Sequence, residues 1–202
     1  MLINRVCSLY FYRRPFVNLR IKHALIIISA LVVSLLIGST YYYLSPFFPQ
    51  VTVATAVIHP TKGNDIAGVV TFIQQADGLH ITARITGLTP GKHGFHVHEF
   101  GNCACDDGIC AGDHYNPTHK PHGSPESTQC HVGDFGNIIA DENGVGAYEQ
   151  VNTHATINGP FSLIGRTVII HAQEDDLTTQ PSGNSGARIG CGVIGIAKQR
   201  KK

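Results

Sequence analysis

Residues 51–85 read VTVATAVIHPTKGNDIAGVVTFIQQADGLHITARI, and this stretch sets the fold class. It contains three short runs in which apolar residues alternate with polar or small ones, at 51–58, 68–73 and 79–85. Alternation of this kind is typical of β-strands, and the Gly, Asn and Asp residues between the runs favour turns. We therefore expect antiparallel strands joined by short turns.

The same pattern continues toward the C-terminus. Further strand candidates are 95–98, 145–151, 167–171 and 192–197. Seven or eight short strands with Gly, Pro and Asn turns predict an all-β domain, a Greek-key antiparallel β-sandwich or flattened barrel. Two stretches, 99–135 and 172–190, do not resemble strands, and loops of this length in a compact domain are usually functional.

An uncharged apolar segment, residues 24–44, precedes the strands. At about 1.5 Å per helical residue it reaches about 30 Å, the thickness of the hydrocarbon core of a bilayer. Residues 1–23 carry five basic and no acidic side chains, so the positive-inside rule keeps them in the cytoplasm. The sequence predicts a transmembrane signal anchor at 24–44, a linker at 45–50, and a domain at 51–197 that is extracellular, luminal or periplasmic. A cleaved signal peptide, which would make the domain a secreted one, is the alternative.

The formal net charge of +1 hides an uneven distribution. Setting aside the five basic residues of 1–23 and the four of a basic tail at 198–202 leaves 6 basic against 14 acidic side chains, a charge of about −8. A nucleic-acid-binding domain would need the opposite sign. That function class is excluded.

Five of the six cysteines follow the apolar segment: Cys103, Cys105, Cys110, Cys130 and Cys191. Disulfides form and persist in non-cytosolic compartments, which agrees with the predicted export of the domain. Five is an odd number, so one thiol is expected to be free or to pair with another chain.

Histidines gather in the first long loop and in the strands beside it. His96 and His98 alternate on a predicted strand, so both imidazoles point to one face. The other members of the set are His114, His122, His131, Asp134 and His171. Six imidazoles and one carboxylate exceed the needs of one tetrahedral site, which favours two ions, and imidazole-rich sets suit copper and zinc. We expect His93 to fix a loop by hydrogen bonds rather than to bind metal.

Five motifs together resemble the signatures of copper/zinc superoxide dismutases. They are GFHVHEFG at 94–101, GDHYNP at 112–117, HVGD at 131–134, GRTVIIH at 165–171 and GCGVIGI at 190–196. The resemblance implies four copper ligands, His96, His98, His114 and His171. It implies four zinc ligands, His114, His122, His131 and Asp134, so that the His114 ring bridges the two metals. It further implies that Asp175 links a copper ligand to a zinc ligand and that Cys191 is one half of a disulfide.

The activity implied by this resemblance is dismutation of superoxide to dioxygen and hydrogen peroxide, by alternating reduction and oxidation of the copper. In the family an arginine holds the substrate anion beside copper, and Arg188 matches it; a guanidinium offers a permanent charge and two-point hydrogen bonding. His114 would supply a proton in the reductive half of the cycle. The alternative is a non-catalytic protein of the same fold that stores or delivers copper, which the pair Cys103-Ala-Cys105 keeps open.

Three features depart from the family pattern or stay open. The partner of Cys191 is Cys103 or Cys110, and a second bridge is expected between Cys130 and either Cys105 or Cys110. The segment between Asp175 and Arg188 is short and lacks the Glu/Lys cluster of the animal enzymes, so we expect reduced electrostatic steering of superoxide. Residues 164–166 and 193–197 resemble the animal-type dimer surface, although 193–197 is equally compatible with a core strand.

Overall fold

The computed structural model describes residues 19–44 and 50–199, and the chain divides into two compact units, residues 1–49 and 50–202. In the first unit, helix α1 (Leu19–Leu44) covers the predicted apolar segment. Its stretch Ile21–Tyr41 has a mean hydropathy of 2.3, and its length and composition suit either a membrane span or a signal sequence. Most of the expected cytoplasmic segment, most of the linker and the end of the basic tail lie outside the described residues.

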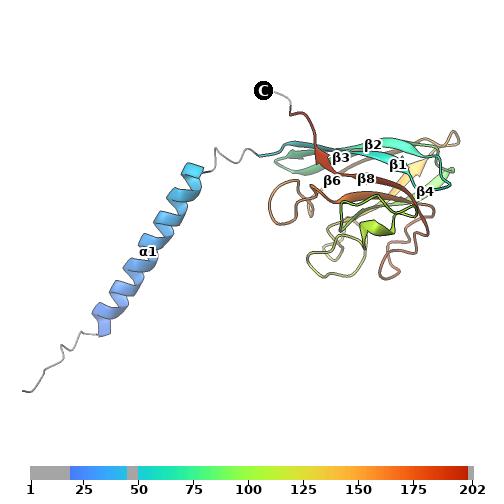
Figure 1. Ribbon diagram of the computed structural model, residues 1–202. Helices are drawn as coiled ribbons and strands as arrows, with labels where there is room; N and C mark the ends of the chain where they lie inside the picture. Colours follow the sequence, from blue (N-terminus) through green and yellow to red (C-terminus); the bar gives the residue numbers. More distant parts are fainter. Residues whose placement is uncertain (1–18, 45–49, 200–202) are drawn as a thin grey trace, which may run out of the picture. The chain divides into compact units, whose positions relative to one another are not determined.

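The second unit is built from nine antiparallel strands (Figure 1). They are β1 (Val53–Pro60), β2 (Ala67–Gln75), β3 (Gly78–Thr86), β4 (Gly91–His98), β5 (Asp134–Ala140), β6 (Gly146–Asn152), β7 (Thr167–His171), β8 (Arg188–Val193) and β9 (Gly195–Ile196). The order β2-β3-β6-β5-β4-β7-β8-β1 closes on itself because β1 also pairs with β2, and β9 adds a short strand to β1. The result is an eight-stranded barrel with one extra strand.

The strand order confirms the predicted Greek-key architecture. β3 pairs with β6 rather than with β4, and β4 lies between β5 and β7. The alternating stretch that predicted the fold forms β1, β2 and β3. Val53 of β1 pairs with Ile73 of β2, and Gln75 of β2 pairs with Gly78 of β3. Residues 192–197, predicted as one strand, instead contribute the end of β8 and the separate β9.

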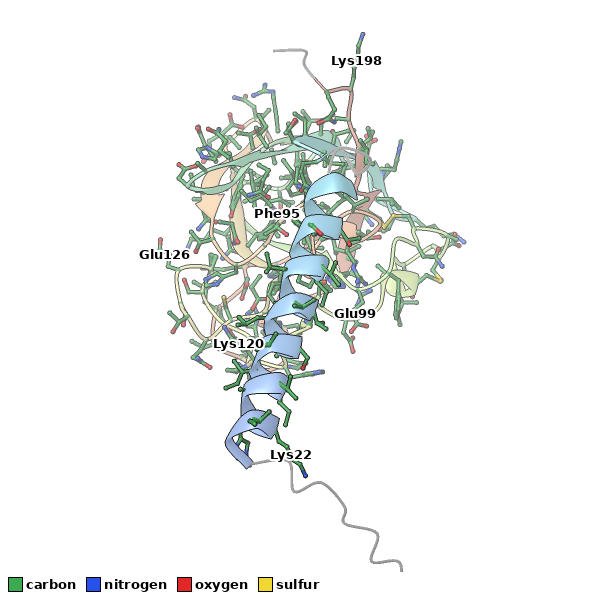
Figure 2. All side chains as sticks on the ribbon, turned by 90° about the vertical axis from the view of Figure 1, so that its left-hand side faces the viewer. Lys22, Phe95, Glu99, Lys120, Glu126 and Lys198 are labelled. Atoms are coloured by element: carbon green, nitrogen blue, oxygen red, sulfur yellow. A yellow bond between two sulfur atoms is a disulfide. The ribbon has the colours of Figure 1, made fainter. Side chains whose placement is uncertain are left out.

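The interior of the barrel is filled by aromatic and branched side chains. The Phe95 and Phe135 rings meet edge to face at 5.5 Å between centroids, and Tyr148 packs against Phe95 at 4.7 Å. Figure 2 shows Phe95 inside the domain, whereas Lys198 projects from its C-terminal end. Fully burying a phenylalanine contributes about 1.5–3 kcal/mol, so these rings add to the stability that the branched side chains of the core also provide.

Two long connections leave the barrel, residues 99–133 between β4 and β5 and residues 172–187 between β7 and β8. Apart from one 3-10 turn, η2 (Ile109–Ala111), they are irregular. The predicted loops 99–135 and 172–190 each extend too far, because β5 already begins at Asp134 and β8 at Arg188. His93 is buried, and its Nδ1 and Nε2 lie 2.8 and 2.9 Å from the carbonyl oxygens of His171 and Thr89. The expectation that His93 fixes a loop is therefore confirmed: it ties the end of β7 to the turn before β4.

Candidate metal centre

Four histidines from the barrel and the first long loop form one cluster. His96 and His98 are two residues apart on β4 and are both buried. His171 ends β7, and His114 pairs with His98 through a single antiparallel bridge. Each of the four can offer a ring nitrogen such that all these nitrogens lie within 4.8 Å of one another. Strand pairing positions the cluster, because β4 and β7 are neighbours in the sheet.

The nitrogens that face each other in this cluster have no hydrogen-bond partner among the described residues. They are His96 Nδ1, His98 Nε2, His114 Nε2 and His171 Nε2. Leaving a buried nitrogen unpartnered costs about 1–3 kcal/mol, and four at one point need an explanation. A metal ion bound by all four supplies one, so the residues fit copper.

The other nitrogen of each of these rings is held in place. His98 Nδ1 donates to the Gly112 carbonyl at 2.9 Å, and His171 Nδ1 donates to the Gly186 carbonyl at 3.2 Å. Hydrogen bonds of this kind fix the tautomer and the orientation of a metal-binding imidazole. The unpartnered nitrogens are therefore aimed at one point rather than free to rotate.

A second cluster adjoins the first and shares His114. The Nδ1 atoms of His114, His122 and His131 lie 2.9, 3.0 and 3.1 Å from one oxygen, Oδ1 of Asp134. The second oxygen of Asp134 accepts hydrogen bonds from the backbone N–H groups of Gly123 and His131, at 3.1 and 2.9 Å. Three imidazoles and one carboxylate are a tetrahedral donor set that suits zinc.

His114 connects the two clusters through its two ring nitrogens. Its Nδ1 faces Asp134 in the second cluster, whereas its Nε2 is one of the unpartnered atoms of the first. One imidazole can therefore serve two ions at once, which is the shared ring that the family resemblance implied.

Asp175, in the second long loop, reaches both clusters from behind. Its two oxygens lie 2.8 Å from His96 Nε2 and 2.9 Å from His122 Nε2. The sequence did not single out Asn137 on β5, yet its side chain exchanges two hydrogen bonds with the backbone of Asp175, at 2.8 and 2.9 Å. Gly183 was also missed, and any Cβ there would lie 1.7 Å from Asp175 Oδ1.

Burial keeps the imidazoles of the first cluster neutral. It lowers the pKa of His96, His98 and His171 below the ordinary value, and burial together with the neighbouring His96 lowers the pKa of His114 to about 3. A neutral imidazole has a lone pair available to a metal ion, whereas an imidazolium does not. Metal binding at this cluster therefore needs little displacement of protons near neutral pH.

The second cluster behaves differently because it contains a carboxylate. Burial would raise the pKa of Asp134, but hydrogen bonds from His114, His122 and His131 hold it well below its usual range. Burial would lower the pKa of His122, but its hydrogen bonds to Asp134 and Asp175 raise it to about 9. The carboxylate thus stays ionised, as a zinc ligand must be.

The first cluster opens into a pocket of about 370 Å³ whose wall includes His98, His114, His171 and Arg188. The Arg188 guanidinium donates to the Gly108 carbonyl at 2.8 Å. Burial lowers the pKa of Arg188, while Asp113 and Asp107 act in the opposite direction. The pocket thus brings a guanidinium and three of the first cluster's histidines to one small space.

The structure pairs the cysteines in one expected and one unexpected way. Cys191 bonds to Cys103, the first of the two partners that the sequence left open. The expected bridge of Cys130 is absent: Cys105 bonds to Cys110 instead, and Cys130 is buried and unbridged. Cys105 and Cys110 lie on one tight turn with Cα atoms 5.5 Å apart, whereas the Cys130 thiol turns inward and donates to the Ser127 carbonyl.

Comparisons with known proteins agree with this geometry. The family model for copper/zinc superoxide dismutase (SODC) matches residues 66–194. Superoxide dismutase (Cu-Zn) 3 of Arabidopsis thaliana is 41% identical over 140 residues, which is 66% of this chain and 85% of that protein. Extracellular superoxide dismutase (Cu-Zn) of Brugia pahangi is 40% identical over 153 residues, 71% of this chain and 76% of that protein.

A solved structure described as that of the clock protein EA4 superposes with a TM-score of 0.69 at 41% identity, covering 74% of this chain and 98% of the other. The family model alone spans well over half of the chain. Four of the five sequence motifs supply six of the seven residues of the two clusters, and His122 lies outside the motifs. The chain belongs to the copper/zinc superoxide dismutase family, and its cofactors are copper and zinc.

Proposed function

We propose that this protein dismutates superoxide to dioxygen and hydrogen peroxide. The observation that carries the proposal is the shared ring of His114, which joins the two clusters at the floor of a pocket that also holds Arg188. Copper, when bound, supplies a centre that accepts and returns one electron at a time. In our proposal it is held by His96, His98, His114 and His171, and zinc is held by His114, His122, His131 and Asp134.

The chain's own residues would perform the remaining steps. Arg188 binds the superoxide anion, because its guanidinium carries a permanent positive charge on the pocket wall. His114 Nε2 faces the other histidines of the first cluster and can carry a proton there. Asp134 fixes Nδ1, the other nitrogen of the same ring. Asp175 is a positioning residue, since it contacts His96 and His122 and not the pocket.

Metal content and activity measured on one purified sample test this proposal. We expect one copper and one zinc per chain, with dismutation, and we expect His96→Ala to lose both copper and activity. Full metal occupancy without turnover would favour the storage or delivery alternative instead. Both cysteines of the pair that suggested that alternative are in disulfides, which removes their thiolates as copper ligands. Because a solved relative is named a clock protein, activity has to be measured on this chain itself.

We also propose that α1 is an uncleaved signal anchor that places the domain on the non-cytosolic side of a membrane. Three observations support it: the length and apolar character of α1, the five basic residues of 1–23, which precede the apolar segment, and two disulfides in the domain. The extracellular relative is consistent with export. In untreated cells the full-length protein should sediment with the membranes, and protease added to intact cells should cleave off the domain. A soluble, N-terminally shortened domain would indicate a cleaved signal peptide.

A homodimer is the third proposal. Phe100, Val193 and Ile196 are large apolar side chains exposed at 57%, 43% and 61%, and the last two lie in the segment 193–197 that resembles a dimer surface. Gly101 and Gly165 lie in the same patch, since a Cβ on Gly101 would lie 2.2 Å from the Gly165 carbonyl and 3.3 Å from Val193. Sedimentation should show a dimer that Phe100→Glu converts to a monomer, and a monomeric parent protein would refute the proposal.

A further inference from the structure

A short disulfide-closed loop contacts Arg188. The bridge between Cys105 and Cys110 encloses residues 105–110. Gly108 lies inside this loop, with a left-handed φ of 73°, and its carbonyl accepts the hydrogen bond from Arg188 Nη1 at 2.8 Å. Among the described residues, the guanidinium of Arg188 makes no other hydrogen bond to the protein. This bond uses one of its five N–H donors.

The loop packs directly against the arginine side chain. Gly108 is buried, and a Cβ there would lie 3.3 Å from Arg188 Cβ and 3.5 Å from its Cδ. The turn is fixed from within, because Gly108 N–H donates to the Cys105 carbonyl at 3.0 Å and Ile109 N–H donates to Asp107 Oδ1 at 3.0 Å. Ala111 N–H also donates to the Gly108 carbonyl at 3.2 Å, so the turn and the bridge together hold this carbonyl in one position.

The backbone of Arg188 is held by different contacts. Its carbonyl accepts a hydrogen bond from Thr61 Oγ1 at 2.8 Å, and the Cys103–Cys191 bridge fixes β8 three residues further along. These contacts set where the side chain begins but not where the guanidinium points. The direction of the guanidinium depends on the Gly108 carbonyl.

We infer that the Cys105–Cys110 disulfide is a positioning device for Arg188: by closing the loop it fixes the Gly108 carbonyl, which orients the remaining guanidinium N–H groups toward an anion in the pocket. The inference rests on the proposed function, in which Arg188 binds the substrate anion. Opening the bridge leaves only the hydrogen bonds of the turn to hold the loop, so the Gly108 carbonyl is less restrained and the guanidinium samples more orientations. Anion affinity falls, while the clusters keep their ligands.

Azide, a small anion, is a direct probe of this effect in the full-length protein loaded with copper and zinc. We compare the parent protein with Cys105→Ser/Cys110→Ser by azide titration, followed by visible absorption of the copper. The dissociation constant should rise about tenfold in the variant, the scale of one lost hydrogen bond from a charged group, with copper and zinc content unchanged. Ala104→Ser, an exposed change in the same connection outside the closed loop, should leave azide affinity within about twofold.

A double-mutant cycle shows whether the effect acts through Arg188. In an Arg188→Ala background, opening the bridge should change azide affinity no further. An unchanged affinity on opening the bridge in the parent protein, or an equal fall in the Arg188→Ala background, overturns the inference.

Gly108→Ala covers the case in which the double serine variant does not fold. It keeps both disulfides but places a methyl group against Arg188, and it must also weaken azide binding; unchanged affinity counts against the positioning role. A parent protein that binds both metals but does not dismutate superoxide would refute the proposed function alone. The azide titrations would still decide the role of the bridge.

Discussion

Asp175 connects the two clusters, because its carboxylate contacts the Nε2 atoms of His96 and His122. The position of this carboxylate depends on a glycine. Gly183 has a left-handed φ of 65°, and a Cβ there would lie 1.7 Å from Asp175 Oδ1 and 2.7 Å from His122 Nε2. Any side chain at 183 must therefore push the carboxylate away from at least one of its two histidines. Partners behind metal ligands of this kind are commonly worth 10–100-fold in affinity, about the range we expect here.

Gly183→Ala should accordingly weaken zinc and copper binding by about tenfold or more, measured by competition with a chromophoric chelator. Gly159→Ala is the matched control, because Gly159 has a similar φ of 77° but a Cβ there meets nothing within 4 Å. Both variants bear a similar cost for placing alanine in the left-handed region, about 1–2 kcal/mol. Equal metal affinities in the two variants would show that Asp175 does not depend on Gly183.

The titration of the histidines predicts how the protein stripped of metal responds to pH. The pKa of His114 is about 3 in the folded chain, and those of His98 and His171 are also lowered. Since the unfolded chain binds more protons than the folded one below about pH 6.5, stability should fall as the pH drops from about 6.5 toward 4. His122, with its pKa raised to about 9, adds stability below about pH 6.5 that is lost as the pH rises through 9.

Denaturation of the chelator-treated protein by urea, repeated across pH 4–9, should therefore give greatest stability near pH 6.5. The metal-loaded protein is the control, because bound metal competes with the protons at these nitrogens and should flatten the acid side of the profile. A profile of the stripped protein that is level between pH 4 and 6.5 would contradict the pKa shifts of the buried histidines.

At the scale of elements, the two disulfides hold the first long connection with different strength. The Cys103–Cys191 bridge spans 88 residues, whereas Cys105–Cys110 spans 5. The chain-entropy model gives about 4–5 kcal/mol for closing the larger loop and about 2 kcal/mol for the smaller one. The larger bridge should matter for stability, and the smaller one for the local position of Gly108.

Urea denaturation of Cys103→Ser/Cys191→Ser should thus show a loss of about 4 kcal/mol, about twice that of Cys105→Ser/Cys110→Ser. The two double variants serve as controls for each other, since each replaces two sulfur atoms by oxygen. The reverse ranking would mean that the short loop, and not the long closure, stabilises the folded domain.

Two kinds of strand were predicted well: strands with one buried and one exposed face, and β7, which is buried throughout but is a short run of branched apolar residues. β1, β2 and β3 show alternating burial, and their apolar residues alternate accordingly. β5 was not predicted, because most of its positions are buried and it contains Asp134, a glycine and Asn137, which together hide the period of a strand. The histidines of the two clusters were found because imidazoles at those spacings are chemically distinctive, whereas Gly183 and Gly108 act through backbone geometry that composition does not show.

The pairing of the cysteines could not be read from the sequence for a similar reason. Cys130 adjoins His131 in the chain, and this proximity suggested a bridge that would hold the zinc-binding loop. In the fold Cys105 is bonded to Cys110, five residues away, and Cys130 is buried and unbridged. Pairing depends on loop conformation, which spacing alone does not determine.

At the scale of the whole molecule, charge opposes the approach of an anion. The predicted domain carries a charge of about −8, and the pocket wall that holds Arg188 also includes Glu99 and Asp113. These carboxylates offset the local positive potential of the guanidinium, so long-range steering should be weak.

We therefore expect kcat/KM for superoxide to change by less than about twofold between low ionic strength and about 0.15 M salt. Glu99→Gln should raise kcat/KM at low salt, because it removes a negative charge from the pocket wall. The control is Glu126→Gln, which removes the same charge outside this wall. A steep fall of the parent protein's kcat/KM with added salt would instead show that a positive potential at the pocket attracts superoxide over a long range.

The proposed function requires that His114 hold a copper and a zinc ion through the two nitrogens of one ring. Its most direct test is a crystal structure of the metal-loaded protein with anomalous scattering measured at the copper and zinc absorption edges. We predict two separate peaks, copper beside His114 Nε2 and zinc beside His114 Nδ1. A single peak, or peaks that do not flank this ring, would contradict the account.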